Sequence, residues 1–160
     1  MILWFVIVAP VVVAEVFRSP MVDYRTVALG AALPVIDVVI GRATVLHTLA
    51  APVVVLTVVM LATIGRRLVR RRWLGVPIGL FLHLVLDATW ADRALFWWPA
   101  FGFGFEGGAP EAGRSLAVLI ALDLLAVGVA VWAARRYGLT DPANRQLLLR
   151  RGHLARGVLA

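Results

Sequence analysis

Long apolar runs separated by arginine clusters constrain this chain more than any other feature of its sequence. The runs cover residues 1–17, 26–40, 44–64, 73–90 and 114–134. A helix that crosses the hydrocarbon core of a bilayer needs about 20 residues, or about 17 at the short end. Hydrophobic residues make up 62% of the chain, whereas soluble domains are roughly half apolar. The sequence therefore predicts an all-α, polytopic helical membrane protein with about five transmembrane segments.

The second apolar run is the shortest of the five and contains Gly30 and Pro34. Irregular backbone is tolerated inside a bilayer only where other helices cover its polar groups. The alternative to five spans is therefore four spans plus a re-entrant helix. The first run has no basic residues before it, so we expect it to be a retained span, with a cleaved signal peptide as the alternative.

The basic residues predict the orientation of the chain. All 16 are arginine, and they concentrate in residues 65–72 and in the segment after residue 134. Arginine-rich connections of membrane proteins usually face the cytoplasm. We therefore expect a transmembrane domain over residues 1–134 of a plasma (inner) membrane protein, with the N-terminus outside and an arginine-rich cytoplasmic tail over residues 135–160.

The same distribution indicates the partners of the chain. A net charge of +7 is compatible with nucleic-acid binding, but arginines placed between apolar runs favour a lipid bilayer and its anionic headgroups as the partners, with no nucleic acid. The chain contains no cysteine, which excludes disulfides, thiolate metal sites and a cysteine nucleophile.

A glycine- and aromatic-rich connection, residues 92–114, is predicted to lie outside the membrane. It either rests at the membrane surface as an aromatic belt or covers a site as a lid. Its aromatic residues are Phe96, Trp97, Trp98, Phe101, Phe103 and Phe105.

Four ionisable residues interrupt the apolar runs at one predicted depth. His83 and Asp87 are four residues apart, so on a helix they share one face. Asp37 lies near the predicted outer end of the second run, and His47 lies near the start of the third. An aspartate at the centre of a membrane helix costs about 2.5–3.5 kcal/mol on insertion scales. Such groups usually pair, line a cavity or bind a ligand.

Two imidazoles and two carboxylates are a donor set for a divalent metal, with zinc or manganese as the candidates. We predict Asp37, His47, His83 and Asp87 as metal ligands. Asp87 is also the candidate catalytic residue, because a carboxylate beside an activated water can act as a general base. The alternative interpretation is structural, since a His–Asp pair can also hold neighbouring helices together by hydrogen bonds.

At these residues the chain resembles the YdjM-like family of inner-membrane-associated metal-dependent hydrolases. The resemblance runs through LPVID, ATVLHTL, HLVLD and LFWWP, over about residues 30–100. The family pattern has L-P-D-x-D-H and H-R-G-x-T-H-S for the first two motifs. Val35, Val38 and Arg42 therefore stand where the family has an aspartate and two histidines. The resemblance implies metal-dependent hydrolysis at a site reduced in ligands.

The expected function is hydrolysis of a phosphoester in a lipid or in another membrane-proximal substrate. Two alternatives remain open from the sequence. A small ion or proton transporter would need a polar path below the four residues, for which the sequence offers Asp123 and Glu15. A non-catalytic membrane scaffold would use the same polar groups only to join helices.

Overall fold

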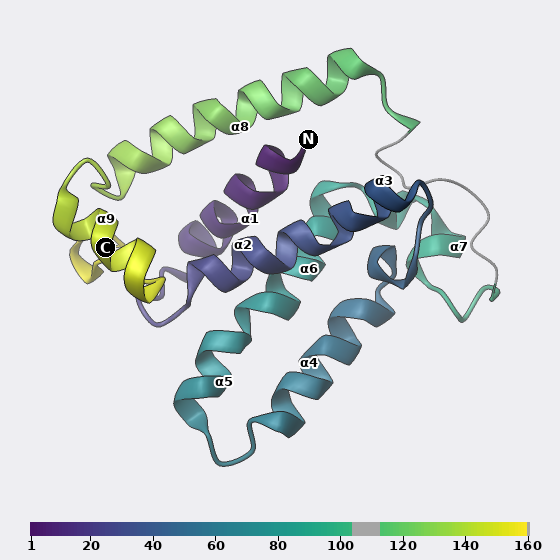
Figure 1. Cartoon of the computed structure of the whole chain (residues 1–160), viewed down its shortest axis with the longest axis horizontal. Coiled ribbons are helices and arrows are strands. Elements are labelled where there is room, and N and C mark those ends of the chain that lie inside the picture. Colours follow the sequence, from purple (N-terminus) through teal and green to yellow (C-terminus); the bar gives the residue numbers. More distant parts are fainter. Residues whose placement is uncertain (104–112, 160) are drawn as a thin grey trace.

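The computed structural model describes residues 1–103 and 113–159, and this part of the chain is helical without a strand (Figure 1). The α-helices are α1 (Ile2–Phe17), α2 (Tyr24–Ala32), α3 (Ile36–Ile40), α4 (Ala50–Ala62), α5 (Arg67–Trp73), α6 (Gly75–Leu86), α7 (Arg93–Phe96), α8 (Leu116–Arg136) and α9 (Pro142–Arg151). Short 3-10 turns are η1 (Leu33–Val35), η2 (Val45–His47), η3 (Thr89–Ala91) and η5 (Arg156–Val158). Residues 104–112, and with them Phe105 of the predicted outer connection, lie outside the described residues.

The prediction of about five transmembrane segments is wrong. Among the described residues, one helix, α8, is long and apolar enough to cross a membrane by length and composition. Helix α1 has 16 residues, α4 has 13 and α6 has 12. At a rise of 1.5 Å per residue these helices extend only about 18–24 Å, whereas the hydrocarbon core of a bilayer is about 30 Å thick. The alternative of four spans plus a re-entrant helix is overturned by the same finding.

Turns inside the apolar runs explain the difference. The second run is divided into α2, η1 and α3 around Pro34, and it ends at Gly41, which has a φ of 78°. The third run begins with η2, so its regular helix starts only at Ala50. The fourth run leaves the helix at Asp87. Hydrophobic composition continues through these breaks, so the runs are longer than the helices they contain.

Glycine residues bring α2 and α6 into close contact at the centre of the molecule. A Cβ atom added at Gly30 would overlap the backbone of Val76 in α6, and one added at Gly79 would overlap the carbonyl group of Val27 in α2. Small residues at such crossings allow two helix backbones to approach closely. This approach sets where the last turn of α6 lies relative to the end of α2.

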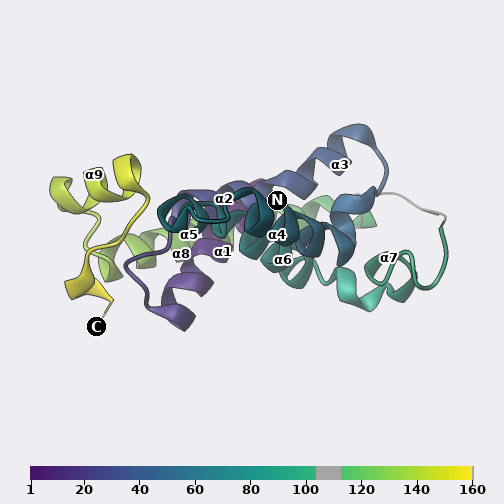
Figure 2. The same cartoon turned by 90° about the horizontal axis from the view of Figure 1, so that it is seen from below.

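The remaining helices surround this pair. Helix α8 packs beside α1, and the Asp123 carboxylate of α8 lies 2.8 Å from the amino group of Met1 (Figure 1). The predicted tail packs back onto the start of α2, where Arg25 Nη1 donates to the carbonyl oxygens of Leu149 and Arg150, each at 3.0 Å. Figure 2 shows α9 at one end of the molecule and α3 and α7 at the other.

Candidate metal centre

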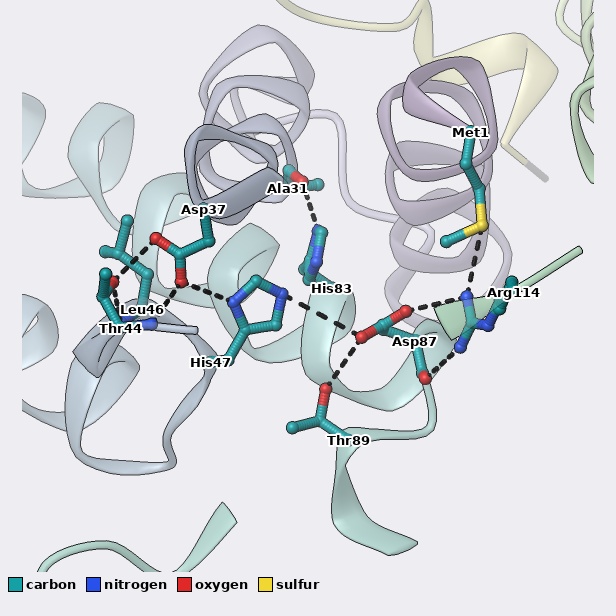
Figure 3. Close-up of polar contacts among 10 residues, drawn as sticks. All are labelled: Met1, Ala31, Asp37, Thr44, Leu46, His47, His83, Asp87, Thr89 and Arg114. Carbon is teal, nitrogen blue, oxygen red and sulfur yellow. Dashed lines mark hydrogen bonds and ion pairs between the residues drawn. The ribbon is translucent and has the colours of Figure 1, made fainter. Parts of the chain in front are cut away.

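The first side chain of the candidate centre, His83, is fixed between α2 and α1. It lies in the last turn of α6, and its Nδ1–H donates to the carbonyl oxygen of Ala31 at 2.7 Å (Figure 3). Carbonyl groups in the last turn of a helix lack partners within that helix, and α2 ends at Ala32. The ring of Phe5 stacks on the imidazole with centroids 3.8 Å apart. These two contacts hold the imidazole in place, and the carbonyl acceptor favours the form with a hydrogen on Nδ1.

The second side chain, His47, is oriented by a carboxylate. Its Nδ1 lies 2.7 Å from Oδ2 of Asp37, and both side chains are fully buried. Asp37 is in turn held by Thr44, whose backbone N–H donates to Oδ2 at 2.8 Å and whose hydroxyl donates to Oδ1 at 2.7 Å. The left-handed turn at Gly41 reverses the chain between α3 and η2, which brings Thr44 and His47 beside Asp37.

The third side chain, Asp87, follows the last residue of α6. Its Oδ1 lies 2.8 Å from Nη1 of Arg114, and Nη2 of the same guanidinium donates to the Asp87 carbonyl oxygen. The Thr89 hydroxyl donates to Oδ2 at 3.1 Å. Oδ2 also lies 4.0 Å from Nε2 of His47 (Figure 3). The carboxylate therefore faces Arg114 with one oxygen and His47 with the other.

His47, His83 and Asp87 together could hold a metal ion. One donor atom from each lies within 4.8 Å of the other two, and the three residues are 0%, 0% and 1% exposed. Nδ1 of each histidine is hydrogen-bonded to an oxygen, so each imidazole would coordinate the metal through Nε2. Tetrahedral zinc with ligands at about 2.1 Å separates donor atoms by about 3.4 Å. The residues present fit a cation if these donor atoms, which lie within 4.8 Å of one another, approach by up to about 1.4 Å.

The charges at the centre also favour a cation. Two carboxylates, Asp37 and Asp87, stand against one guanidinium, Arg114. With both histidines neutral, the cluster carries one net negative charge in a buried environment. Buried charge is costly unless it is balanced. A divalent cation would place positive charge beside the carboxylates without requiring a protonated histidine.

The structure brings together the four residues that the sequence singled out. Three of them, His47, His83 and Asp87, form the group of donor atoms, whereas Asp37 contacts the far nitrogen of His47. In a metal site built on these three residues, Asp37 would be an outer partner that orients His47. This arrangement therefore differs from the predicted set of four direct ligands.

Sequence reasoning missed Thr44, Thr89 and Arg114. A signal existed for Arg114, because it is an arginine at the start of the fifth apolar run on the side predicted to be outside, where arginine is disfavoured. No comparable signal marks the two threonines, since their roles depend on tertiary contacts.

Other polar residues considered in the sequence lie away from the centre. Asp123 accepts from the backbone N–H of Trp4 at 3.3 Å. Glu15 accepts from the Tyr137 hydroxyl at 2.8 Å. His153 donates from Nδ1 to the carbonyl oxygen of Val22 at 3.0 Å. Each of these groups therefore serves a local helix–helix or helix–loop contact.

Comparison with known proteins adds no identification to this geometry. No protein-family model matches the chain, and neither a curated protein nor a solved structure is similar to it.

Proposed function

We propose that this protein is a membrane-associated, metal-dependent hydrolase whose His47, His83 and Asp87 bind one divalent cation. The observation that carries the proposal is the fixing of both imidazoles through Nδ1, at 2.7 Å by Asp37 and at 2.7 Å by the Ala31 carbonyl group. In metal sites such outer partners set the histidine tautomer and direct Nε2 toward the cation. The same positions carry the resemblance to the YdjM-like hydrolases.

Zinc is the cation that this donor set favours. Catalytic zinc sites commonly combine three nitrogen or oxygen ligands from the protein with one open position. Manganese prefers sites richer in carboxylate and water. Two histidines and one carboxylate also bind iron(II) in oxygenases, so the metal found in the protein will separate hydrolysis from oxygen chemistry.

Each residue then has a defined task in hydrolysis. Bound zinc would supply a Lewis acid and an activated water near neutral pH. Asp37 keeps His47 in one orientation, and Asp87 offers Oδ2 to the cation while Oδ1 remains with Arg114. This geometry supports Asp87 as a ligand rather than as the general base. The Arg114 guanidinium lies beside the site, where it would bind an anionic oxygen of a phosphoester.

The surface of the molecule supports a location at a membrane. Large hydrophobic side chains on α1, α4 and α8 are exposed, and such apolar surfaces mark contacts with membranes or other proteins. Helix α8, with 21 residues, is the candidate span. A phosphoester of a lipid is therefore the substrate class we favour.

Burial of the three ligands favours a second candidate, a structural metal site in a non-catalytic protein. None of His47, His83 and Asp87 is more than 1% exposed, and structural zinc sites are closed to exchangeable ligands. The two candidates share the metal and differ in whether one coordination position accepts an outside molecule.

Metal content tests the shared part of the proposal. The protein would be purified in mild detergent without chelators, and bound metal would be measured by mass spectrometry in the parent and in His83→Ala/Asp87→Ala. The matched control is Asp92→Asn/His153→Ala, which alters one carboxylate and one histidine outside the centre. Near-stoichiometric metal in the parent and control, with none in a folded site variant, is expected. Metal-free parent protein after incubation with zinc or manganese would overturn the site.

Cobalt substitution separates catalysis from structure. The visible spectrum of the cobalt(II) protein should shift on adding inorganic phosphate if one position is open, and phosphoester substrates should then be hydrolysed. An unchanged spectrum together with no hydrolysis would overturn the proposed hydrolase activity. A structural metal site would then be the remaining candidate.

A further inference from the structure

A second polar site lies at the opposite end of α6 from the metal centre, where three segments of the chain meet. Its walls come from the loop before α2, the last turns of α5 and the end of α9, and they border an open hollow of about 330 Å³. Ligand pockets in proteins span about 300–1,000 Å³. We call this site the basic pocket, after its polar lining residues Asp23, Arg25, Arg71, Arg72, Arg150, Arg151 and His153.

Hydrogen bonds between the three segments build the basic pocket. The Thr26 hydroxyl of α2 contacts the carbonyl oxygen of Arg72 at 2.7 Å, which ties the end of α5 to α2. The backbone N–H of Tyr24 donates to the carbonyl oxygen of Gly152 at 2.8 Å, which ties the end of α9 to the same helix. Arginines that are about 80 residues apart in the sequence are thereby held around one cavity.

The charge inside the basic pocket is strongly unbalanced. Within the described residues that line it, Asp23 is the one carboxylate. Its oxygens accept from Nε and Nη2 of Arg25 at 3.1 and 2.9 Å, and Arg72 Nε lies 3.5 Å away. Arg25 is thus matched by Asp23, and Arg71, Arg150 and Arg151 add positive charge that no second lining carboxylate offsets.

We propose that the basic pocket binds a phosphate group, presented either by a soluble phosphate compound or by an anionic lipid headgroup. Guanidinium groups pair with phosphate through two parallel hydrogen bonds, and several arginines converging on one cavity suit its multiple oxygens. Leu68 and Met21 line the same cavity and are 78% and 42% exposed. An apolar margin beside a cationic cavity matches a lipid headgroup with its attached chains.

This inference is independent of the proposed hydrolase activity, because it uses none of the metal-site residues. The 12 residues of α6 separate the two sites, and Figure 2 places α9 at the end of the molecule away from α3 and α7. Phosphate binding here would anchor or regulate the protein without taking part in the chemistry at the metal centre.

The test follows thermal unfolding of the full chain in neutral detergent at constant ionic strength. Inorganic phosphate and dihexanoyl phosphatidic acid would be titrated separately, with dihexanoyl phosphatidylcholine as the zwitterionic comparison. The pocket variant is Arg71→Gln/Arg151→Gln. Its matched control is Arg67→Gln/Arg145→Gln, which removes the same charge from the same two helices outside the pocket.

The half-saturating concentration should rise at least tenfold in the pocket variant and less than twofold in the control. Stabilisation by both phosphate and phosphatidic acid would support the site and identify soluble phosphate as a sufficient ligand. Stabilisation by phosphatidic acid alone would support the site and identify a lipid headgroup. No stabilisation of the parent, or equal loss in both double variants, would overturn the proposal.

Discussion

Nδ1 of His47 lies 2.7 Å from Oδ2 of Asp37, although one residue belongs to η2 and the other to α3. Both side chains are fully buried, and the carboxylate is held by two hydrogen bonds from Thr44. A carboxylate behind a histidine ligand fixes the ring and raises its basicity toward a metal. In the proposed metal site the pair would therefore act on metal affinity, which can be measured without knowing the substrate.

Asp37→Asn should weaken zinc binding by about 10–100-fold, because outer partners of ligating histidines typically contribute that much to affinity. The variant keeps the size of the side chain but loses the negative charge behind His47. Competition with a calibrated zinc chelator would measure the change. Asp92→Asn, at the cap of α7, should leave the affinity unchanged, and an equal loss in both variants would contradict the assigned role.

Gly79→Ala should destabilise the protein by about 1–3 kcal/mol, the usual cost of forcing an extra methyl group into a packed contact. The new Cβ atom would meet the Val27 carbonyl group and push α6 away from α2. Because His83 follows one turn later on α6, zinc affinity should fall as well. Denaturant unfolding and chelator competition would measure the two effects.

Gly128→Ala provides the matched control for this change. Gly128 lies inside α8 with open space at the position of the added Cβ atom. Alanine favours helix by up to about 1 kcal/mol relative to glycine, so this variant should be slightly stabilised. Destabilisation by both substitutions alike would remove the argument for a specific α2–α6 contact.

The sequence predicted the residues of the centre better than it predicted the helices that carry them. The four-residue spacing of His83 and Asp87 predicts that they share one helix face, and the two lie together although Asp87 caps the helix end. The order of the apolar runs predicts that Asp37 and His47 lie at the same depth. The turn at Gly41 produces that proximity without two membrane spans.

Two features lay beyond the sequence for physical reasons. Hydropathy measures the solvent that a segment prefers and not its backbone conformation. The apolar runs therefore extend through Pro34, η2 and Asp87, although the regular helices break or end there. Arg114 reaches Asp87 across 27 positions of the chain, and no periodicity relates residues that far apart. The spacing of residues predicts which side chains are neighbours within one helix. Contacts between helices depend on how closely the helix backbones approach, which the spacing does not predict.

Arg114→Gln should make zinc stabilise the protein more than it stabilises the parent. The substitution leaves the buried Asp87 carboxylate without the cation that lies 2.8 Å away, which should cost the metal-free protein about 1–3 kcal/mol. Zinc would then supply the missing positive charge, so its effect on Tm should grow. Arg114→Lys, which keeps the charge, should resemble the parent. A smaller zinc effect in the glutamine variant would contradict this balance of charges.

Asp23, in the basic pocket at the end of the molecule away from the metal centre, should make the stability of the fold depend on pH in the acid range. Burial raises the pKa of its carboxyl group, but hydrogen bonds and charge from Arg25, with the charge of Arg72, outweigh burial and hold the pKa below its usual value of 3.8. The unfolded chain therefore binds the proton more tightly than the folded chain. The stability contributed by Asp23 is complete above about pH 4 and is lost as the pH falls below that value.

The parent should accordingly be more stable than Asp23→Asn at pH 7, and the difference in Tm should narrow at pH 3. Arg25→Gln removes the main partner of the carboxylate. At pH 7 the Tm of this variant should therefore lie closer to that of Asp23→Asn than the Tm of the parent does. Thermal unfolding of the three proteins at both pH values would measure this. A parent–variant difference that stays constant between pH 7 and pH 3 would mean that Asp23 stabilises the junction of α2 and α9 by shape and neutral hydrogen bonds. Its charge would then have no part in holding the basic pocket together.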